Sequence, residues 1–468
     1  MDDGYIKGGD YMMGIPIQII YLVLLIIFIV ILFVGFRRPI YEVMVASFLF
    51  IVIISKSFGS LMEALLYPAT SSLFYAIFGF MAVAVIFDGT KVVNGIINLM
   101  LSIVGRIRGG AGYVALLGST FMASLSGTGP GNVAATGVFT IPMMKRSNYP
   151  SALAATTEMS ASMLGNIIPP AGIILLTYGI LDDIYPNTVS MSTWMIIAYG
   201  IGFWFFVQRW ITLTVLCRLY KVKPVPREEL PRFSDSIKKG WPALFLPLFI
   251  FIPLFLDAQF TDFIVQRLGE DGASAFSGSV LMFTPALAGA YAIAIGRKSL
   301  SSGKVKISSV VDILRNSLLQ VVPIGVTIYM AYSISQIFIS LDMEEAVREW
   351  FVSFDLSLIT LVIILPLFFM VLGMVLPGSA QVAILGGAMI VVFDMLGGNS
   401  VLFAALLPAM TGALEGMTPP LALGLFVAMG IANSKFKDTA KLAIVWIVVH
   451  LLMTMILLYN LLPIFGLK

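Results

Sequence analysis

Two acidic residues, Glu158 and Glu415, lie inside long apolar stretches of the sequence. An ionisable side chain within a membrane segment is costly, so it usually marks the path of an ion, a proton or a substrate. Either carboxylate could coordinate Na⁺ or carry a proton, and the alternative for each is a structural hydrogen bond to a neighbouring helix. Arg209 also lies in an apolar stretch. We expect its side chain to extend to the membrane interface rather than to bind substrate.

Both acids lie close to interruptions rich in Gly, Ser, Thr and Pro. The first interruption is SLSGTGPGN at residues 124–132, and a helix break, GNIIPP, follows at 165–170. Later in the chain, PGSAQ at 377–381 and GALEGMTPP at 412–420 repeat this arrangement. A Pro-Pro pair ends a helix and frees backbone groups one turn earlier. Two interrupted hydrophobic segments at matching places in two halves indicate the binding site of a transporter.

The residues at these interruptions have the chemistry that such a site needs. Freed backbone carbonyls suit a cation, and helix N-termini suit a carboxylate. Eight polar residues are predicted to bind substrate: Ser124, Ser126, Thr128, Asn132, Asn166, Ser379, Gln381 and Thr418. The coupling ion, Na⁺ or H⁺, is assigned to the two acids and to six glycines: Glu158, Glu415, Gly127, Gly129, Gly165, Gly378, Gly412 and Gly416. The alternative is that these small residues only let helices approach closely.

The composition predicts which elements position these residues. Of the 468 residues, 59% are hydrophobic and 11% are charged, whereas a soluble domain has about 25% charged residues. The chain is therefore predicted to be an all-α polytopic membrane protein. With one Cys and one His, a Cys-based metal site is excluded. The sequence has no nucleotide-binding loop and no Ser/His/Asp arrangement, so no cofactor beyond the coupling ion, no nucleic acid and no enzymatic activity are expected.

The apolar runs predict two inverted repeats, each with a helical hairpin and a broken helix. The half-length runs at 111–123 and 132–144 are too short to span alone, and basic residues flank both, so we expect a hairpin that enters and leaves on one face. The runs at 356–375 and 380–395 form the second, opposed hairpin. Because Lys and Arg favour cytoplasmic loops, the N-terminus is predicted to lie outside.

The chain is accordingly divided into five parts. These are N-terminal scaffold helices (1–92), a first transport repeat (93–190), scaffold helices with basic cytoplasmic loops (191–316), a second transport repeat (317–432) and a C-terminal scaffold helix (433–468).

The stretches that carry these features resemble the large membrane subunit of tripartite ATP-independent periplasmic (TRAP) transporters. The resemblance lies in residues 105–150, in NIIPPAGIIL at 166–175, and in residues 415–443, which begin with the sequence EGMTPPLALG. NVAATGVFTIPMMKR at 132–146, with Glu158 after it, and VPREELPRF at 225–233 are most similar to the TAXI branch of that family.

The resemblance implies an elevator mechanism, in which a transport domain with both hairpins and both broken helices slides against a scaffold in the cytoplasmic (inner) membrane. It implies cation-coupled import of a small organic acid delivered by an extracytoplasmic binding protein. It also implies a small four-helix membrane subunit, expected here as a separate chain. The TGPGN tip departs from typical members in having a proline, Pro130. Two alternatives are a carboxylate carrier of the elevator type without a binding protein, and an intramembrane enzyme that uses Glu158 or Glu415.

Overall fold

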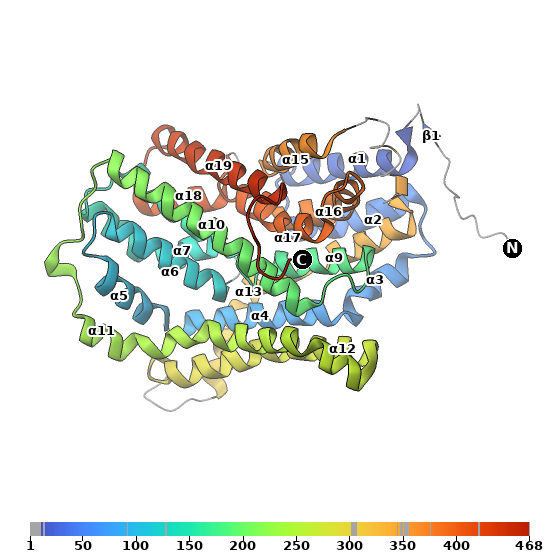
Figure 1. Ribbon diagram of the computed structural model, residues 1–468. Helices are drawn as coiled ribbons and strands as arrows, with labels where there is room; N and C mark the ends of the chain where they lie inside the picture. The colour runs from blue at the N-terminus through green and yellow to red at the C-terminus, as the bar shows by residue number, and fades with distance from the viewer. Residues whose placement is uncertain are drawn as a thin grey trace.

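The computed structural model describes most of the chain as helices (Figure 1). The described residues are 11–12, 15–90, 92–126, 129–300, 307–343, 345–346, 350, 354, 356–374, 376–419 and 422–467. Among them, the strands are a two-residue pair, β1 (Tyr11–Met12) and β2 (Ile15–Pro16). The predicted all-α class is confirmed.

The N-terminal part consists of five helices. They are α1 (Ile17–Val30, continued by the π-turn η1, Ile31–Gly35), α2 (Ile40–Ser55), α3 (Leu61–Thr70), α4 (Ser72–Gly89) and α5 (Val92–Val104). Pro16 and Pro39 directly precede α1 and α2, since proline fixes φ without needing a hydrogen-bonded N–H at a helix start.

The first hairpin and the first broken helix lie where the sequence predicts them. They comprise α6 (Gly110–Ser126), α7 (Gly129–Arg146), α8 (Ser151–Ser162), the 3₁₀ turn η2 (Met163–Asn166) and α9 (Gly172–Ile184). The helix stops at η2 because Pro169 and Pro170 follow. Lys145 and Arg146 end α7, where positive charge stabilises the helix dipole.

The middle of the chain consists of long helices and short turns. They are α10 (Met191–Leu219), η3 (Arg227–Glu229), α11 (Phe233–Gly240), η4 (Trp241–Phe245), α12 (Leu246–Leu300) and α13 (Ile307–Ser340). Gly269 bends α12 into two arms through a φ of 74°, a conformation that glycine adopts without steric cost. Ser277 in the second arm donates a hydrogen bond to Asp257 in the first (3.0 Å).

The second hairpin and the second broken helix follow the predicted order. They comprise α15 (Leu358–Leu372), α16 (Gly378–Met395), α17 (Ser400–Pro408), the π-turn η5 (Ala409–Ala413) and α18 (Leu423–Ala432), and α19 (Phe436–Leu458) ends the fold. Ser357 and Asn399 cap α15 and α17 by accepting hydrogen bonds from backbone N–H groups.

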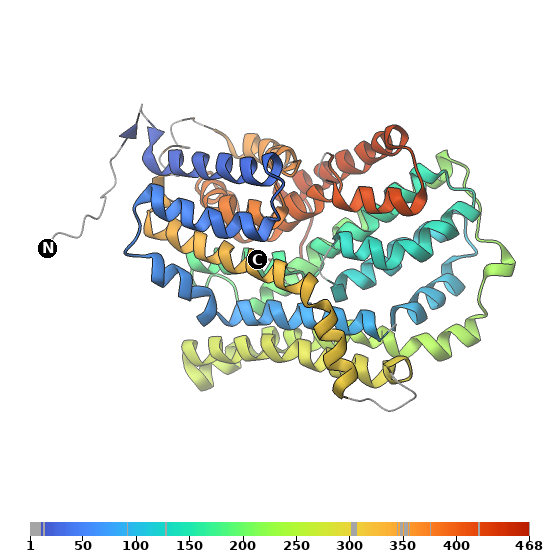
Figure 2. The same cartoon turned by 180° about the vertical axis from the view of Figure 1, so that it is seen from behind.

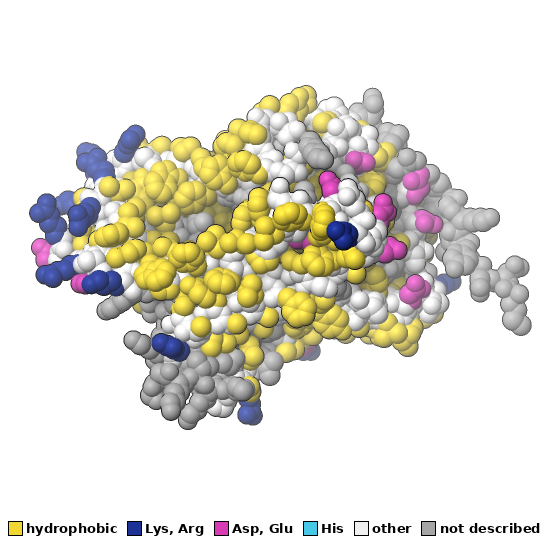
Figure 3. Space-filling model, turned by 60° about the horizontal axis from the view of Figure 1, so that its bottom comes forward, with side chains coloured by type: hydrophobic (Ala, Val, Ile, Leu, Met, Phe, Trp, Pro, Cys, Tyr) yellow, Lys and Arg dark blue, Asp and Glu magenta, His cyan; other side chains and the backbone are white. Residues whose placement is uncertain are grey.

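The charge distribution matches a protein that crosses a membrane. Lys and Arg gather at one end of the molecule, Asp and Glu gather at the other, and an apolar band covers the surface between them (Figure 3). Among the described helices, four are long and apolar enough to cross a membrane, and two bent helix pairs could bring the number to six. The first hairpin opens at the basic end, where α7 finishes. Helices α4 and α12 pack together along one side of the molecule, and α13 lies beside α2, α3 and α4 (Figure 2).

Candidate functional site

Asn166 joins the first break to the first hairpin tip and to the second break. Its Nδ2 donates a hydrogen bond to the Gly412 carbonyl (2.6 Å), and its Oδ1 accepts one from the Gly129 N–H (3.2 Å). Gly129 begins α7 and Gly412 lies in the π-turn η5. The Asn166 carboxamide therefore pairs with the Gly129 N–H at the first hairpin tip and with the Gly412 carbonyl at the second break, two backbone groups that the interrupted helices leave free.

Glu415 makes the corresponding contact in the second half. Its Oε2 accepts a hydrogen bond from the N–H of Gly378 (2.7 Å), the first residue of α16. A carboxylate at a helix N-terminus is stabilised by the helix dipole. The backbones at this point are in contact, since a methyl group added to Gly378 would lie 2.4 Å from the Cα of Gly412. Glycine is therefore needed at this tip.

Two carboxamides occupy equivalent places in the hairpins. Asn132 and Gln381 each lie three residues after the glycine that begins the second arm. Asn132 Nδ2 donates to the carbonyls of Ser119 (2.8 Å) and Ser162 (3.2 Å), and Gln381 Nε2 donates to that of Leu376 (2.8 Å). Each amide oxygen is buried and has no hydrogen-bond partner among the described residues. Leaving such an acceptor unpaired costs about 1–3 kcal/mol, and an amide oxygen is able to accept a hydrogen bond or to coordinate a cation.

Glu158 is enclosed by hydroxyl groups. Its carboxylate is fully buried (0% exposed) and accepts hydrogen bonds from Ser119 on α6 (3.1 Å), from Thr136 and Thr140 on α7, and from Ser162 on its own helix (3.0 Å). A buried polar group left without a partner costs about 1–3 kcal/mol, so these contacts hold the segments that supply them together. Glu158 therefore fastens both arms of the first hairpin to α8.

Arg209 and His450 form a buried basic pair behind the breaks. The expectation that Arg209 extends to the interface is wrong: it is 1% exposed, and its Nε donates to the Ser160 carbonyl at the end of α8 (2.7 Å). His450 on α19 pairs with the guanidinium (3.4 Å), and its Nε2 bonds the Ala409 carbonyl at the end of α17 (2.9 Å). The positively charged guanidinium suits the C-terminus of α8. Because arginine can only donate, His450 Nδ1 accepts and the Nε2–H group donates to the Ala409 carbonyl.

The other predicted site residues lie in the helix ends and turns of the two interruptions in each half. Gly165 lies in η2 and Ser379 lies in the first turn of α16. Thr418 Oγ1 donates to the Leu414 carbonyl (2.7 Å), a contact inside the second break, and Gly416 lies in the same break. Ser124 and Ser126 are in the last turn of α6. Gly127 and Thr128 fall outside the described residues.

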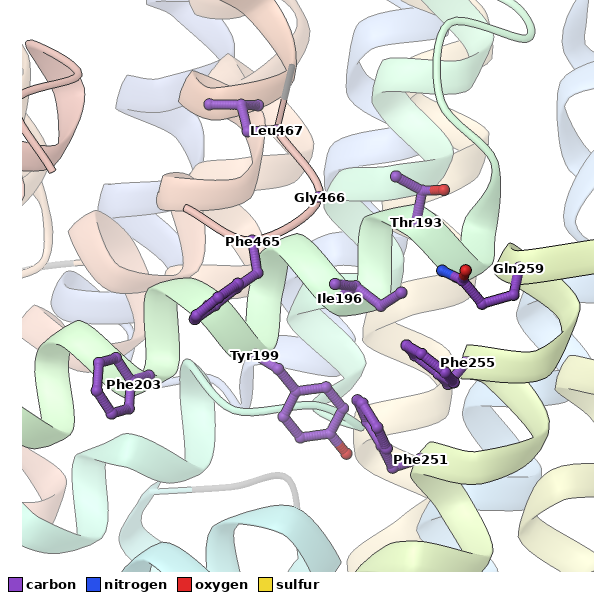
Figure 4. Close-up of a pocket in the computed structure, with 11 residues that line it drawn as sticks. Thr193, Ile196, Tyr199, Phe203, Phe251, Phe255, Gln259, Phe465, Gly466 and Leu467 are labelled. Atoms are coloured by element: carbon purple, nitrogen blue, oxygen red, sulfur yellow. The ribbon is translucent and has the colours of Figure 1, made fainter. Parts of the chain in front are cut away.

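A cavity of about 710 Å³ lies away from this centre (Figure 4). It is lined by α10, by the first arm of α12 and by the C-terminal segment. Phe203, Phe251, Phe255 and Phe465 project into it, and Gln259 and Thr193 lie near one another at another part of the wall. None of the predicted site residues lines this cavity, so its aromatic wall has the character of a surface between helices rather than of an ion site.

Opposed hairpins, paired broken helices and a buried polar centre within an apolar belt define a membrane transporter rather than an enzyme. The family model described as "Tripartite ATP-independent periplasmic transporter, DctM component" matches residues 19–463. The chain belongs to this family, and it is a multi-pass membrane transporter subunit.

Named relatives have low to moderate identity. The chain is 23% identical over 368 residues to the C4-dicarboxylate TRAP transporter large permease protein DctM of Pseudomonas aeruginosa, and the match covers 79% of each chain. It is 30% identical over 158 residues to the 2,3-diketo-L-gulonate TRAP transporter large permease protein YiaN of Escherichia coli, over 33% of this chain and 35% of that protein.

Two solved structures share the fold. The MtrF structure of Neisseria gonorrhoeae superposes with a TM-score of 0.60 and 15% identity, over 86% of this chain and 83% of that one. The YdaH transporter of Alcanivorax borkumensis gives a TM-score of 0.58 and 17% identity, over 86% of this chain and 88% of that one. At these identities, the likeness shows the helical architecture alone.

The hydroxyl cage around Glu158 predicts a large loss of stability in Glu158→Gln. The amide NH₂ of Gln cannot accept as the carboxyl oxygen does, so at least one buried hydroxyl group loses its partner, and the first hairpin should be destabilised by about 1–3 kcal/mol. Thermal unfolding in detergent measures the effect. Glu63→Gln is the control, because Glu63 is exposed on α3. Equal melting temperatures for the two variants would contradict the fastening role of Glu158.

Proposed function

We propose that this chain is the permease subunit of a Na⁺-coupled importer of a small organic acid. The observation that carries the proposal is the pair of unpartnered amide oxygens, Asn132 Oδ1 and Gln381 Oε1. We therefore assign these two residues to the ion, whereas the sequence alone predicted that they bind substrate. They lie three residues into the second arm of each hairpin, beside the breaks that Asn166 and Glu415 join to the hairpin tips. Carbonyl-type and carboxylate oxygens are the ligands that hard cations take from proteins.

Sodium fits these groups better than a proton does. A carboxamide oxygen is too weak a base to hold a proton at neutral pH, whereas it is a good ligand for a metal cation. Glu158, the other candidate for a proton carrier, already accepts hydrogen bonds from four hydroxyl groups. Glu415 has one oxygen on the Gly378 N–H and supplies the negative charge that a cation site needs.

A carboxylate fits the remaining features of the centre. Helix α7 begins at the first hairpin tip and α18 begins beside the second break, and a helix N-terminus stabilises an anion. The relatives named for C4-dicarboxylate and for 2,3-diketo-L-gulonate take acidic substrates. Ser379 and Thr418, together with Asn166, are the polar side chains assigned to its orientation.

The hydrogen bonds at the centre support movement of one rigid unit. Asn166, Glu415 and Glu158 tie both hairpins and both broken helices together. Arg209 and His450 tie α10 and α19 to the same broken helices. We therefore place α10 and α19 in the moving unit, which amends the division that put 191–316 and 433–468 in the scaffold. The aromatic cavity between α10 and α12 (Figure 4) suits a sliding surface.

Family membership and the charge distribution support a proposal for the partners and the orientation. We propose an extracytoplasmic binding protein and a separate small membrane subunit as partners. We also propose that the chain belongs to the TAXI branch, which the resemblance of residues 132–146 and 225–233 supports. The basic end of the molecule (Figure 3) is then cytoplasmic, in line with the preference of Lys and Arg for cytoplasmic loops. We propose that the protein lies in the inner membrane, with its N-terminus on the extracytoplasmic side.

Uptake into proteoliposomes tests the function. The vesicles would carry this chain with the neighbouring small subunit and the cognate binding protein, and radiolabelled C4–C5 dicarboxylates would be added. An imposed Na⁺ gradient should drive uptake, and an imposed proton gradient of equal size should not. Uptake driven only by protons would contradict the sodium assignment, and the absence of uptake under either gradient would contradict the proposed substrate class.

The amide oxygens predict a specific change in sodium dependence. Asn132→Ala and Gln381→Ala should each raise the Na⁺ concentration for half-maximal uptake about tenfold, the effect of losing roughly 1.4 kcal/mol of binding. Glu415→Gln should abolish Na⁺-driven uptake, because it removes the negative charge. The control is Asn399→Ala, since the Asn399 oxygen already caps α17. Unchanged sodium dependence in the two carboxamide variants would contradict the site.

A further inference from the structure

Asp183, at the end of α9, is held by side chains from two other helices. Tyr67 on α3 donates a hydrogen bond to its Oδ1 (2.5 Å), and Gln336 Nε2 on α13 lies 3.4 Å from its Oδ2. Helices α3 and α9 lie side by side (Figure 1). Among the described residues, no Lys or Arg forms an ion pair with Asp183, so the donors described for this partly buried carboxylate are neutral.

The two helices that hold Asp183 are fastened to each other. Tyr329 on α13 donates a hydrogen bond to the Leu65 carbonyl on α3 (2.6 Å). Helix α13 also lies beside α2 and α4 (Figure 2). We therefore count all of α13 with the scaffold, which amends the division that put residues 317–340 in the second transport repeat.

The helix that carries Asp183 belongs to the other side of this boundary. Helix α9 follows the first break, and Tyr185, two residues after Asp183, donates a hydrogen bond to Asp394 on α16 (3.2 Å). Both residues of that second contact lie in the unit that we propose to move. The contact between Tyr67 and Asp183, by comparison, joins the moving unit to the scaffold.

A close approach of α13 to α9 lies at the same boundary. The Tyr332 hydroxyl donates a hydrogen bond to the Leu175 carbonyl (3.3 Å). A methyl group added to Gly179 would lie 2.5 Å from Tyr332 Oη, so a glycine is needed where this tyrosine meets α9. A hydrogen bond is lost by about 3.6 Å, so a slide of α9 past α3 and α13 by a few ångströms breaks these contacts.

We propose that Asp183 is a latch of the transport movement. Its contacts with Tyr67 and Gln336 hold the moving unit against the scaffold in the arrangement seen here, and they separate each time the unit slides. Neutral donors suit this role, because breaking a buried ion pair is costlier than releasing a single hydrogen bond. The inference rests on the proposed function, since it takes the two parts as ones that move past each other.

Cross-linking tests whether Tyr67 and Asp183 separate during transport. In Tyr67→Cys/Asp183→Cys, a bifunctional maleimide would join the two new thiols, and Cys217 is buried (2% exposed), so it should not react. The double variant should take up a C4–C5 dicarboxylate under a Na⁺ gradient before cross-linking, because a latch is not needed for the movement itself. It should lose uptake after cross-linking, because the moving unit is then fixed to the scaffold.

Tyr185→Cys/Asp394→Cys is the matched control for the cross-link. This pair is also a tyrosine that donates to an aspartate, but both residues lie within the moving unit, so cross-linking should leave uptake unchanged. Continued uptake by cross-linked Tyr67→Cys/Asp183→Cys would overturn the proposal. Absence of uptake by this variant before cross-linking, in folded protein, would overturn it too.

Distance measurements test whether the latch holds this arrangement. Spin labels at Glu63→Cys on α3 and Thr188→Cys after α9, both exposed positions, would report the separation of scaffold and moving unit by electron paramagnetic resonance. Tyr67→Phe should lower the ratio of this arrangement to others about tenfold, the effect of losing roughly 1.4 kcal/mol of interaction. Tyr185→Phe should leave the distance distribution unchanged. Identical distributions in the two variants would contradict the latch, since a merely structural role of Tyr67 lowers the melting temperature without moving the distribution.

The unmodified chain distinguishes this inference from the proposed function. If it fails to take up any of the dicarboxylates under a Na⁺ gradient, the proposed function is wrong, and the spin-label distances still decide the role of Asp183. If it transports them and Tyr67→Phe behaves as Tyr185→Phe does, the function stands and the latch is wrong.

Discussion

Backbone groups freed inside a membrane need partners, and this constraint organises the centre of the molecule. The bilayer core offers no water, so a broken helix survives there only when protein or a wet cavity satisfies its ends. The described part of the chain contains four such interruptions, two hairpin tips and two breaks, and side-chain contacts join them. Asn166 satisfies groups at Gly129 and Gly412, and Glu415 satisfies Gly378.

The same contacts join the parts that our proposal moves as one unit. Each break is tied to a hairpin tip by a side chain, and behind the breaks Arg209 and His450 bind the carbonyl ends of α8 and α17. The amide oxygens of Asn132 and Gln381 remain without partners among the described residues. In our account a cation completes these two positions, so ion binding strengthens the junction that holds the hairpin tips closed. A ligand that binds one arrangement better than another shifts the population toward it.

The sequence predicted the elements well because apolar runs and Gly/Pro breaks are local signals. Both hairpins and both breaks lie within a few residues of their predicted bounds. The partners of the charged residues were not predictable, because they come from distant segments: Ser119, Thr136 and Thr140 surround Glu158 from two other helices. Arg209 was misread for the same reason. Considered alone, a single arginine in an apolar segment is expected to extend to the membrane interface. The fold instead brings the Ser160 carbonyl and His450, which is 241 positions away, to the Arg209 guanidinium.

Sodium-dependent thermal unfolding of the purified chain tests the central claim most directly, because it needs neither a gradient nor partner proteins. Melting temperatures in detergent would be compared in NaCl and in choline chloride at equal ionic strength, for the unmodified chain and for the double variant Asn132→Ala/Gln381→Ala. A ligand at 100 times its dissociation constant stabilises the folded state by about 2.7 kcal/mol. The account predicts that Na⁺ raises the melting temperature of the unmodified chain and has no specific effect on the double variant. Equal sodium effects on both proteins, or none on either, would contradict it.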